Sequence, residues 1–246
     1  MICALKATAI DEAEHLVRPC VGPTTRILVL MNGLGLEERF AGWFGSKRVF
    51  GGLAFTCINR GDSGFIHHIA YGSVTLGHLE NDSREIEAAL SVWEPSRVTV
   101  ISAPSLLRAR WEKLCWNIPF NGLTVASGGV PTDRIVGDPD SRSVVRSLIA
   151  EVVAAGNADL TAHAKSERLD ANSIADRMLE LTDTMGPYRP STLVDFVEGK
   201  TMEIDAIFGE PLRRARALVT ATPQLDLLTA VLLDLDTAPQ ARNVSR

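Results

Sequence analysis

Several features that mark common protein classes are missing from this 246-residue sequence. Its four cysteines form no Cys-x-x-Cys pair, which disfavours a zinc site and a disulfide framework. There is no lysine and arginine run to contact phosphate backbones, and the net charge is −5. No apolar run approaches the roughly 18 residues of a membrane span, and neither Gly-x-Ser-x-Gly nor His-Glu-x-x-His occurs. These absences argue against membrane-spanning, nucleic-acid-binding and hydrolytic proteins and fit a reduced, cytoplasmic setting.

What is present is a composition that can bury a large core, with 46% hydrophobic residues and a mean hydropathy of +0.08. The first third alternates apolar runs with amphipathic segments, which predicts a parallel sheet. We expect strands at residues 2–5 and 25–31, with helices at 11–21 and 36–44. Short strands punctuated by glycine (50–59, 64–71 and 72–77), then a helix after residue 83 and a strand at 97–101, would continue the sheet, antiparallel at its far end.

From residue 103 onward the apolar spacing is that of helices. The sequence therefore predicts a sheet domain at 1–102 and a helical domain at 103–246. Within the second we expect helices at 103–124, 140–155, 171–184, 192–198, 202–208, 211–219 and 224–235, with Gly156 ending the second of them. The chain also opens inside a strand, so we expect one apolar sheet edge to lack its neighbour.

A polar stripe inside an apolar segment is the most informative feature. Lys113, Asn117 and Asn121 follow one another at four-residue spacing between tryptophan, leucine, isoleucine and phenylalanine. On a helix of about 3.6 residues per turn, this spacing keeps the three side chains on one slowly drifting face. Burying such groups without partners is costly, so they serve either an internal hydrogen-bond network or a polar ligand. A ligand that suits one cation and two amides is a small anion with carbonyl or hydroxyl oxygens.

A second polar group, Asn32, follows an apolar strand in the turn Asn-Gly-Leu-Gly. This turn is not a dinucleotide loop, because the third glycine of Gly-x-Gly-x-x-Gly is missing and Glu37 and Glu38 would repel a pyrophosphate. It is better interpreted as a tight turn that presents the amide of Asn32. A turn asparagine without a ligand is the structural alternative.

Each of the other candidates also has a structural explanation. Among apolar neighbours, Lys113 would have a lowered pKa and could donate a proton to a carbonyl oxygen. The structural alternative is that its side chain reaches the surface or pairs with Glu112 or Glu203. Glu203 could orient Lys113, or it could be a solvated helix glutamate. Ser191, which follows a proline, is typical of a helix N-cap.

Two further clusters suggest no site. Strand alternation sends the rings of His67 and His68 to opposite faces, which is wrong for one metal ion, and no metal site is expected. Arg213, Arg214 and Arg216 are interpreted as a solvated helix face.

Taken together, these residues resemble the 2-dehydropantoate 2-reductase (ketopantoate reductase) family. The resemblance runs from about residue 4 to about residue 235 and rests on order and spacing. The matching segments are Lys6-Ala7, Asn32-Gly33-Leu34-Gly35, the region from Gly51 to Gly77 with His68, Trp111-x-Lys113-Leu114 with Asn117 and Asn121, Pro190 to Asp195, and Thr201-x-Glu203-Ile204-Asp205.

The resemblance implies a partial Rossmann-type doubly wound sheet followed by an all-α domain of the 6-phosphogluconate dehydrogenase-like type. It implies NADPH-dependent reduction of a 2-keto acid, 2-dehydropantoate, to the 2-hydroxy acid pantoate, in the pathway to pantothenate and coenzyme A, by a homodimer. Lys113 would protonate the C2 oxygen, and Glu203 would orient that lysine and the substrate hydroxyl.

For the remaining residues the resemblance implies binding roles. Asn117, Asn121 and Ser191 would bind the substrate. Asn32 would lie between substrate and nicotinamide, and Lys6 would line the cofactor side together with Asn32 and Glu203.

The departures from the family pattern affect the cofactor and the substrate. The sequence has no Gly-x-Gly-x-x-Gly, so we expect an N-terminally incomplete reductase with impaired activity. The alternative is a non-catalytic remnant that serves as a dimerisation or small-acid-binding module; a different hydroxy-acid dehydrogenase is a third possibility. Gly122 and Thr192 stand where the family usually has proline and methionine, and Pro119 should bend the helix that carries Lys113.

Overall fold

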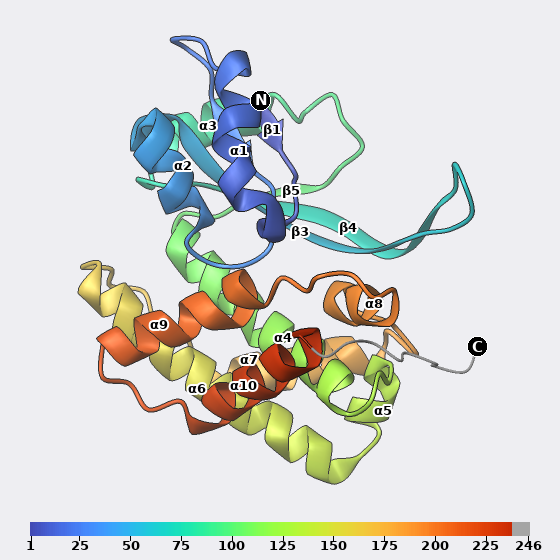
Figure 1. Cartoon of the computed structure of the whole chain (residues 1–246). Coiled ribbons are helices and arrows are strands. Elements are labelled where there is room, and N and C mark those ends of the chain that lie inside the picture. Colours follow the sequence, from blue (N-terminus) through green and yellow to red (C-terminus); the bar gives the residue numbers. More distant parts are fainter. Residues whose placement is uncertain (238–246) are drawn as a thin grey trace. The chain divides into compact units, whose positions relative to one another are not determined.

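The computed structural model describes residues 1–237, except the side chains at positions 59 and 60 (Figure 1). The chain forms two compact units, Met1–Arg110 and Trp111–Arg246. The first unit contains all the described strands and the start of the long helix α4 (Leu106–Ala126). The second unit is helical. The predicted order, a mixed sheet followed by an all-helical part, is confirmed.

The sheet of the first unit has five strands in the order β1 (Ile2–Cys3), β2 (Ile27–Val29), β3 (Val49–Arg60), β4 (Ile66–His78) and β5 (Val100–Ser102). The pairs β1–β2, β2–β3 and β4–β5 are parallel, and β3–β4 is antiparallel. All three residues of β2 are buried, as in a strand covered on both faces. The other elements are η1 (Ala7–Ala9), α1 (Ile10–Val17), η2 (Arg18–Cys20), α2 (Leu36–Phe44), η3 (Ser46–Arg48) and α3 (Ser83–Ser91).

Strand β4 is one long strand, and the two short strands predicted at 64–71 and 72–77 are wrong. Thr56 pairs with Tyr71 and Phe55 with Ser73, so Gly72 is an extra residue on β4. The extra residue makes a β-bulge, with positive φ at Tyr71 (60°) and Gly72 (148°). The glycine that suggested a break therefore bends a continuous ribbon, which extends from the rest of the sheet in Figure 1.

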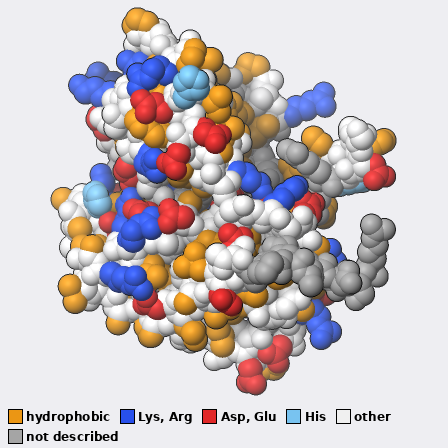
Figure 2. Space-filling view, in the orientation of Figure 1, with side chains coloured by type: hydrophobic (Ala, Val, Ile, Leu, Met, Phe, Trp, Pro, Cys, Tyr) orange, Lys and Arg blue, Asp and Glu red, His pale blue; other side chains and the backbone are white. Residues whose placement is uncertain are grey.

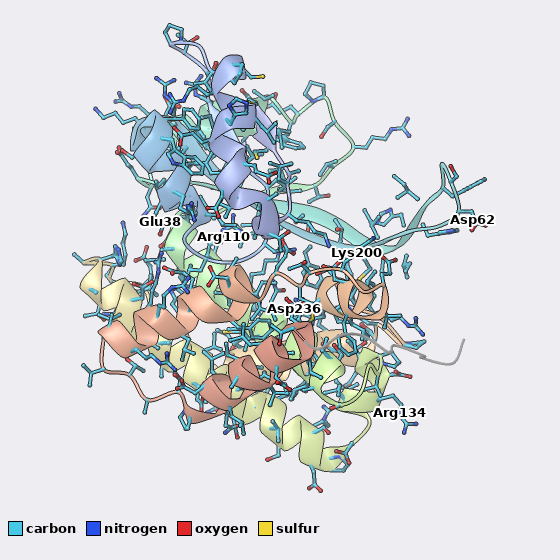
Figure 3. The ribbon with its side chains drawn as sticks, viewed as in Figure 1. Glu38, Asp62, Arg110, Arg134, Lys200 and Asp236 are labelled. Atoms are coloured by element: carbon cyan, nitrogen blue, oxygen red, sulfur yellow. The ribbon has the colours of Figure 1, made fainter. Side chains whose placement is uncertain are left out.

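The outer end of the β3–β4 ribbon exposes apolar side chains. Phe65 is 68% and Ile66 72% exposed, and Figure 2 shows hydrophobic atoms at this end of the ribbon. The loop that joins the strands is a turn in which Phe65 N–H donates to the carbonyl of Asp62 at 2.8 Å (Asp62 is labelled in Figure 3). A second register shift lies between Cys57 and Ile58. The two irregularities and the exposed end distinguish this ribbon from the buried parallel strands.

The second unit contains the helices α5 (Thr132–Val136), α6 (Pro139–Ala162), α7 (Ala171–Asp183), α8 (Ser191–Val197), α9 (Glu210–Ala217) and α10 (Pro223–Thr237). The short helix α5 was not expected. Helix α6 continues through Gly156, so the predicted end at this residue is wrong. An added Cβ at Gly156 would stand 3.0 Å from two atoms of the Trp111 indole. Gly156 is therefore a close-packing glycine within a helix.

The segment before α9 also differs from the prediction. Residues 201–203 are not helical, and Asp205–Gly209 forms a π-helical turn (η4) in place of an α-helix at 202–208. Such turns are rare and occur frequently at functional sites. Met202 N–H donates to Asp236 Oδ1 of α10 at 3.1 Å, which fixes the start of this segment (Asp236 is labelled in Figure 3).

Candidate active site

The predicted polar stripe lies on helix α4, which runs without interruption through Pro119. Asn117 and Asn121 are 5% and 2% exposed, and Lys113 is half-buried. The apolar residues between them are buried as well, so the stripe does not face bulk solvent. The helix thus holds a cation and two amides in an environment where each polar group requires a partner.

Two other segments of the second unit meet α4 beside the amides. The ring of Trp116, next to Asn117, lies 6.2 Å from the ring of Tyr188, which precedes α8. One residue after Asn121, an added Cβ at Gly122 would stand 3.0 Å from Phe208 of the π-helical turn. The absence of a side chain at Gly122 therefore allows this turn to pack closely against α4.

Some buried polar atoms have no hydrogen-bond partner within the described part of the chain. Among them are Oδ1 of Asn121 and Oγ1 of Thr192, the second residue of α8, which is 1% exposed. Most buried polar side-chain atoms in folded proteins are hydrogen-bonded, and an unmade bond costs roughly 1–3 kcal/mol. Such atoms point to a ligand or an ordered water molecule as the missing partner.

The predictions that Ser191 is a helix N-cap and that Glu203 is a solvated helix glutamate are both wrong. Ser191 is the first residue of α8, the N-cap is Pro190, and no side-chain capping hydrogen bond forms at this end among the described residues. Ser191 is exposed and so accessible to solutes. Glu203 is 5% exposed and precedes the π-helical turn, so it is not a solvated helix glutamate. Glu112, the neighbour of Lys113, forms an ion pair with Arg177 at 2.5 Å.

A buried carboxylate that no sequence motif singles out lies near the start of the stripe. Asp159 of α6 is 2% exposed and accepts hydrogen bonds from Trp111 Nε1 at 2.8 Å and from an Arg214 guanidinium nitrogen at 3.0 Å. His163 lies 3.2 Å from its other oxygen. Arg214 is only 16% exposed, so the prediction of a solvated arginine face is wrong for this residue. Only the three-dimensional fold brings α6, α4 and α9 to the same carboxylate.

In the first unit, Asn32 is half-buried and follows β2 in a turn with positive φ at Gly33 (104°) and Gly35 (82°). Glycine adopts these angles without strain, which explains the Asn-Gly-Leu-Gly sequence. Lys6 is exposed just before η1. The turn leads directly into α2, with Gly35 as the N-cap residue.

The expectation that Glu37 would repel an anion needs correction. Glu37 is 2% exposed and accepts from Arg110 Nε at 2.9 Å, while Arg110 also donates to the carbonyl of Met31 at 2.7 Å (Arg110 is labelled in Figure 3). Burial raises the pKa of Glu37, and the guanidinium of Arg110 opposes that shift. The carboxylate is therefore used internally, tying α2 to the end of β2. Glu38 is exposed.

The chemistry available on the polar stripe of α4 is that of one ammonium group and two neutral amides. Burial raises the pKa of the Cys115 thiol, so this cysteine stays protonated and is no nucleophile. In the described part of the chain, no three His, Cys, Asp or Glu side chains could hold a metal ion, and no helix is long and apolar enough to cross a bilayer. The arrangement can bind an acid through the amides and the ammonium group and can stabilise negative charge on oxygen.

Comparison with known proteins agrees with this architecture. The family described as ketopantoate reductase PanE/ApbA matches residues 1–81, and its C-terminal part matches residues 105–236. A 2-dehydropantoate 2-reductase of Nostoc sp. is 34% identical over 243 residues, which cover 96% of this chain and 73% of the relative. This chain belongs to the ketopantoate reductase family.

Solved structures of the family have the same fold. A 2-dehydropantoate 2-reductase from Geobacter metallireducens matches with a TM-score of 0.89 and 39% identity, over 95% of this chain and 76% of that one. One from Methylococcus capsulatus matches with a TM-score of 0.83 and 31% identity, over 98% and 76%. The match therefore includes both the sheet unit and the helical unit.

Proposed function

We propose that this ketopantoate reductase family member reduces 2-dehydropantoate to pantoate with NADPH and that Lys113 is the proton donor. The family is one of oxidoreductases, and the relatives named above are 2-dehydropantoate 2-reductases. The observation that carries the proposal for this chain is Oδ1 of the buried Asn121, which has no hydrogen-bond partner in the described part of the chain. Asn121 lies one helical turn from Asn117 and two from Lys113. A small polar acid would supply the missing hydrogen bond.

The proposed reaction depends on charge that develops on oxygen. When a hydride reaches C2 of the keto acid, negative charge builds on the C2 oxygen. The ammonium group of Lys113 stabilises that charge and donates the proton. Asn117, Asn121 and Ser191 bind the acid, and Glu203 orients the lysine and the substrate hydroxyl.

The residues present fit one part of the cofactor. The hydride is supplied by a bound dihydronicotinamide. Two residues suit the nicotinamide and ribose end of this cofactor. They are Asn32, whose amide can donate and accept hydrogen bonds, and Lys6. A pyrophosphate is normally held at a glycine-rich turn that begins a helix, and the 246-residue sequence contains no Gly-x-Gly-x-x-Gly. Accordingly, we expect weak affinity for NADPH from these residues alone.

The test is NADPH oxidation with 2-dehydropantoate, followed by absorbance, for the wild type and for Lys113→Ala. We expect Lys113→Ala to lower kcat/KM by about 10²- to 10⁴-fold, the usual contribution of a positioned proton donor. The matched control is Lys47→Ala, which removes an exposed lysine of the sheet unit. Equal kcat/KM for Lys113→Ala and the wild type would refute the role of Lys113.

A second candidate function is a small-acid-binding module that does not use a nicotinamide, which the buried amides of Asn117 and Asn121 on α4 would serve equally. The two functions differ in NADPH binding, measured by fluorescence titration. Pantoate binding together with undetectable NADPH binding would support the module. Micromolar NADPH affinity would exclude it.

We also propose a cytoplasmic homodimer. The setting is supported by four free cysteines, three of them buried, in the absence of a disulfide framework. Dimerisation is supported by apolar side chains that α10 leaves exposed, Leu227 at 68% and Leu233 at 51%. Light scattering coupled to size-exclusion chromatography tests the dimer, and a monomer at micromolar concentration would contradict it.

A further inference from the structure

Thr192, like Asn121, is buried and has a side-chain oxygen without a hydrogen-bond partner among the described residues. Its side chain is 1% exposed, and its hydroxyl contacts no donor or acceptor at hydrogen-bond distance within residues 1–237. A valine of the same shape would avoid this cost. A hydroxyl kept in such a position points to a partner that arrives with a ligand.

Other helical threonines of this unit form a hydrogen bond from the side-chain hydroxyl to a carbonyl of their own helix. Their hydroxyls donate to the carbonyl four residues earlier, at distances of 2.7 Å for Thr124, 2.7 Å for Thr182 and 2.6 Å for Thr229. Thr192 is the second residue of α8, so no carbonyl of its own helix lies four residues earlier. Its hydroxyl therefore needs an acceptor or donor from elsewhere.

The surroundings of Thr192 connect it to the polar stripe. Tyr188, in the loop before α8, lies against Trp116 of α4, the neighbour of Asn117. That loop is fixed by Thr132, whose N–H donates to the Tyr188 carbonyl at 2.9 Å. Thr192 also directly follows Ser191, one of the proposed substrate-binding residues. The start of α8 is thus held beside the helix that carries the amides.

We propose that the hydroxyl of Thr192 hydrogen-bonds a hydroxyl group of the bound acid, which makes Thr192 a specificity-determining residue for hydroxylated over purely aliphatic side chains. The inference rests on the proposed function and adds the substrate feature that this residue selects. Lys113 and the amides can serve the charged and keto oxygens. The substrate hydroxyl that Glu203 orients can donate to that carboxylate and still accept a hydrogen bond from the Thr192 hydroxyl. A site built to bond a hydroxyl discriminates against analogues without it, since its own polar group is then left unpaired.

The test measures the affinity of the full chain for pantoate and for 4-deoxypantoate, the same acid without its terminal hydroxyl, by calorimetry. We expect the wild type to prefer pantoate. Thr192→Val should reduce that preference by about tenfold, which corresponds to one lost hydrogen bond, and Thr192→Ser should keep it within about twofold. Thr192→Ala carries the same expectation as Thr192→Val if the valine protein does not fold.

Thermal unfolding distinguishes a ligand contact from an internal one. If the hydroxyl has no partner in the free protein, Thr192→Val raises the unfolding temperature. A lower unfolding temperature with an unchanged pantoate preference would mean that an internal water molecule is the partner, and it would overturn the inference. Absence of pantoate binding by the wild type would also overturn it. Binding without NADPH oxidation would instead contradict the reductase proposal and leave the role of Thr192 standing.

Discussion

Near the start of α4 the carboxylate of Asp159 is enclosed by donors from Trp111 and Arg214, whereas further along the helix the amide oxygen of Asn121 meets none within the described residues. Both groups are 2% exposed. A satisfied buried group makes the fold specific, and removing it leaves its partners unpaired. A buried polar group without a hydrogen bond lowers the stability of the free protein, and its presence is explained if a ligand supplies the missing hydrogen bond. The two regions therefore predict opposite responses to substitution.

The largest effect on stability is expected at the satisfied region. Asp159→Ala removes the acceptor of Trp111 and one ionic partner of Arg214, which keeps Glu210 at 2.9 Å. Because Arg214 keeps Glu210, we expect a loss near the lower end for broken buried ion pairs, about 3 kcal/mol in the free energy of unfolding. Urea denaturation measures this. A loss below about 1 kcal/mol would remove the distinction between the two regions.

A smaller effect is expected where α6 packs against Trp111. Gly156→Ala places a methyl group 3.0 Å from an indole that its bond to Asp159 holds in place. Overpacking of this kind costs about 1–3 kcal/mol, which exceeds the gain of about 1 kcal/mol from replacing a helical glycine.

The matched control for Gly156 is Gly42 of α2, where an added Cβ meets nothing within 4 Å. Gly42→Ala should raise the unfolding free energy by up to about 1 kcal/mol. If Gly156→Ala and Gly42→Ala raised the free energy of unfolding by similar amounts, the packing of Gly156 against Trp111 would be loose.

The smallest effect concerns an exposed carboxylate on the same helix as Asp159. Asp138 is the N-cap of α6, and hydrogen bonds from the Ser141 hydroxyl and N–H hold its pKa below the ordinary value of 3.8. A lowered folded pKa stabilises the protein above the unfolded pKa, and this contribution disappears as the pH falls through the folded value. Stability of the wild type relative to Asp138→Asn should therefore decline below about pH 4. A difference that is the same at pH 7 and pH 2, by urea denaturation, would contradict the assignment.

The elements that the sequence predicted well are those whose signal is local. The four-residue spacing of Lys113, Asn117 and Asn121 needs only a helix, and the apolar run that contains β2 needs only a buried strand. The elements it missed depend on distant partners. Gly72 is a bulge residue because the residues on either side of it pair with neighbouring residues of β3. Gly156 is a glycine within a helix, where the indole of Trp111 from α4 occupies the space that a side chain would need.

The candidate site divides in the same way. The polar residue types and their order along the chain could be predicted, since they follow from composition and spacing. The burial of Glu203, the unmade hydrogen bond of Thr192 and the internal use of Glu37 by Arg110 could not, because each depends on segments far apart in the sequence. These features are stabilised or destabilised by tertiary contacts, which a local sequence pattern does not predict.

The central claim is that the buried amide of Asn121 exists for a bound acid, and Asn121→Leu tests it most directly. Calorimetric titration with pantoate, combined with thermal unfolding, compares this variant with the wild type. We predict a variant that is at least as stable as the wild type and binds pantoate at least about tenfold more weakly, since leucine has a similar volume and no unpaired oxygen. A destabilised variant with unchanged pantoate affinity would contradict the account.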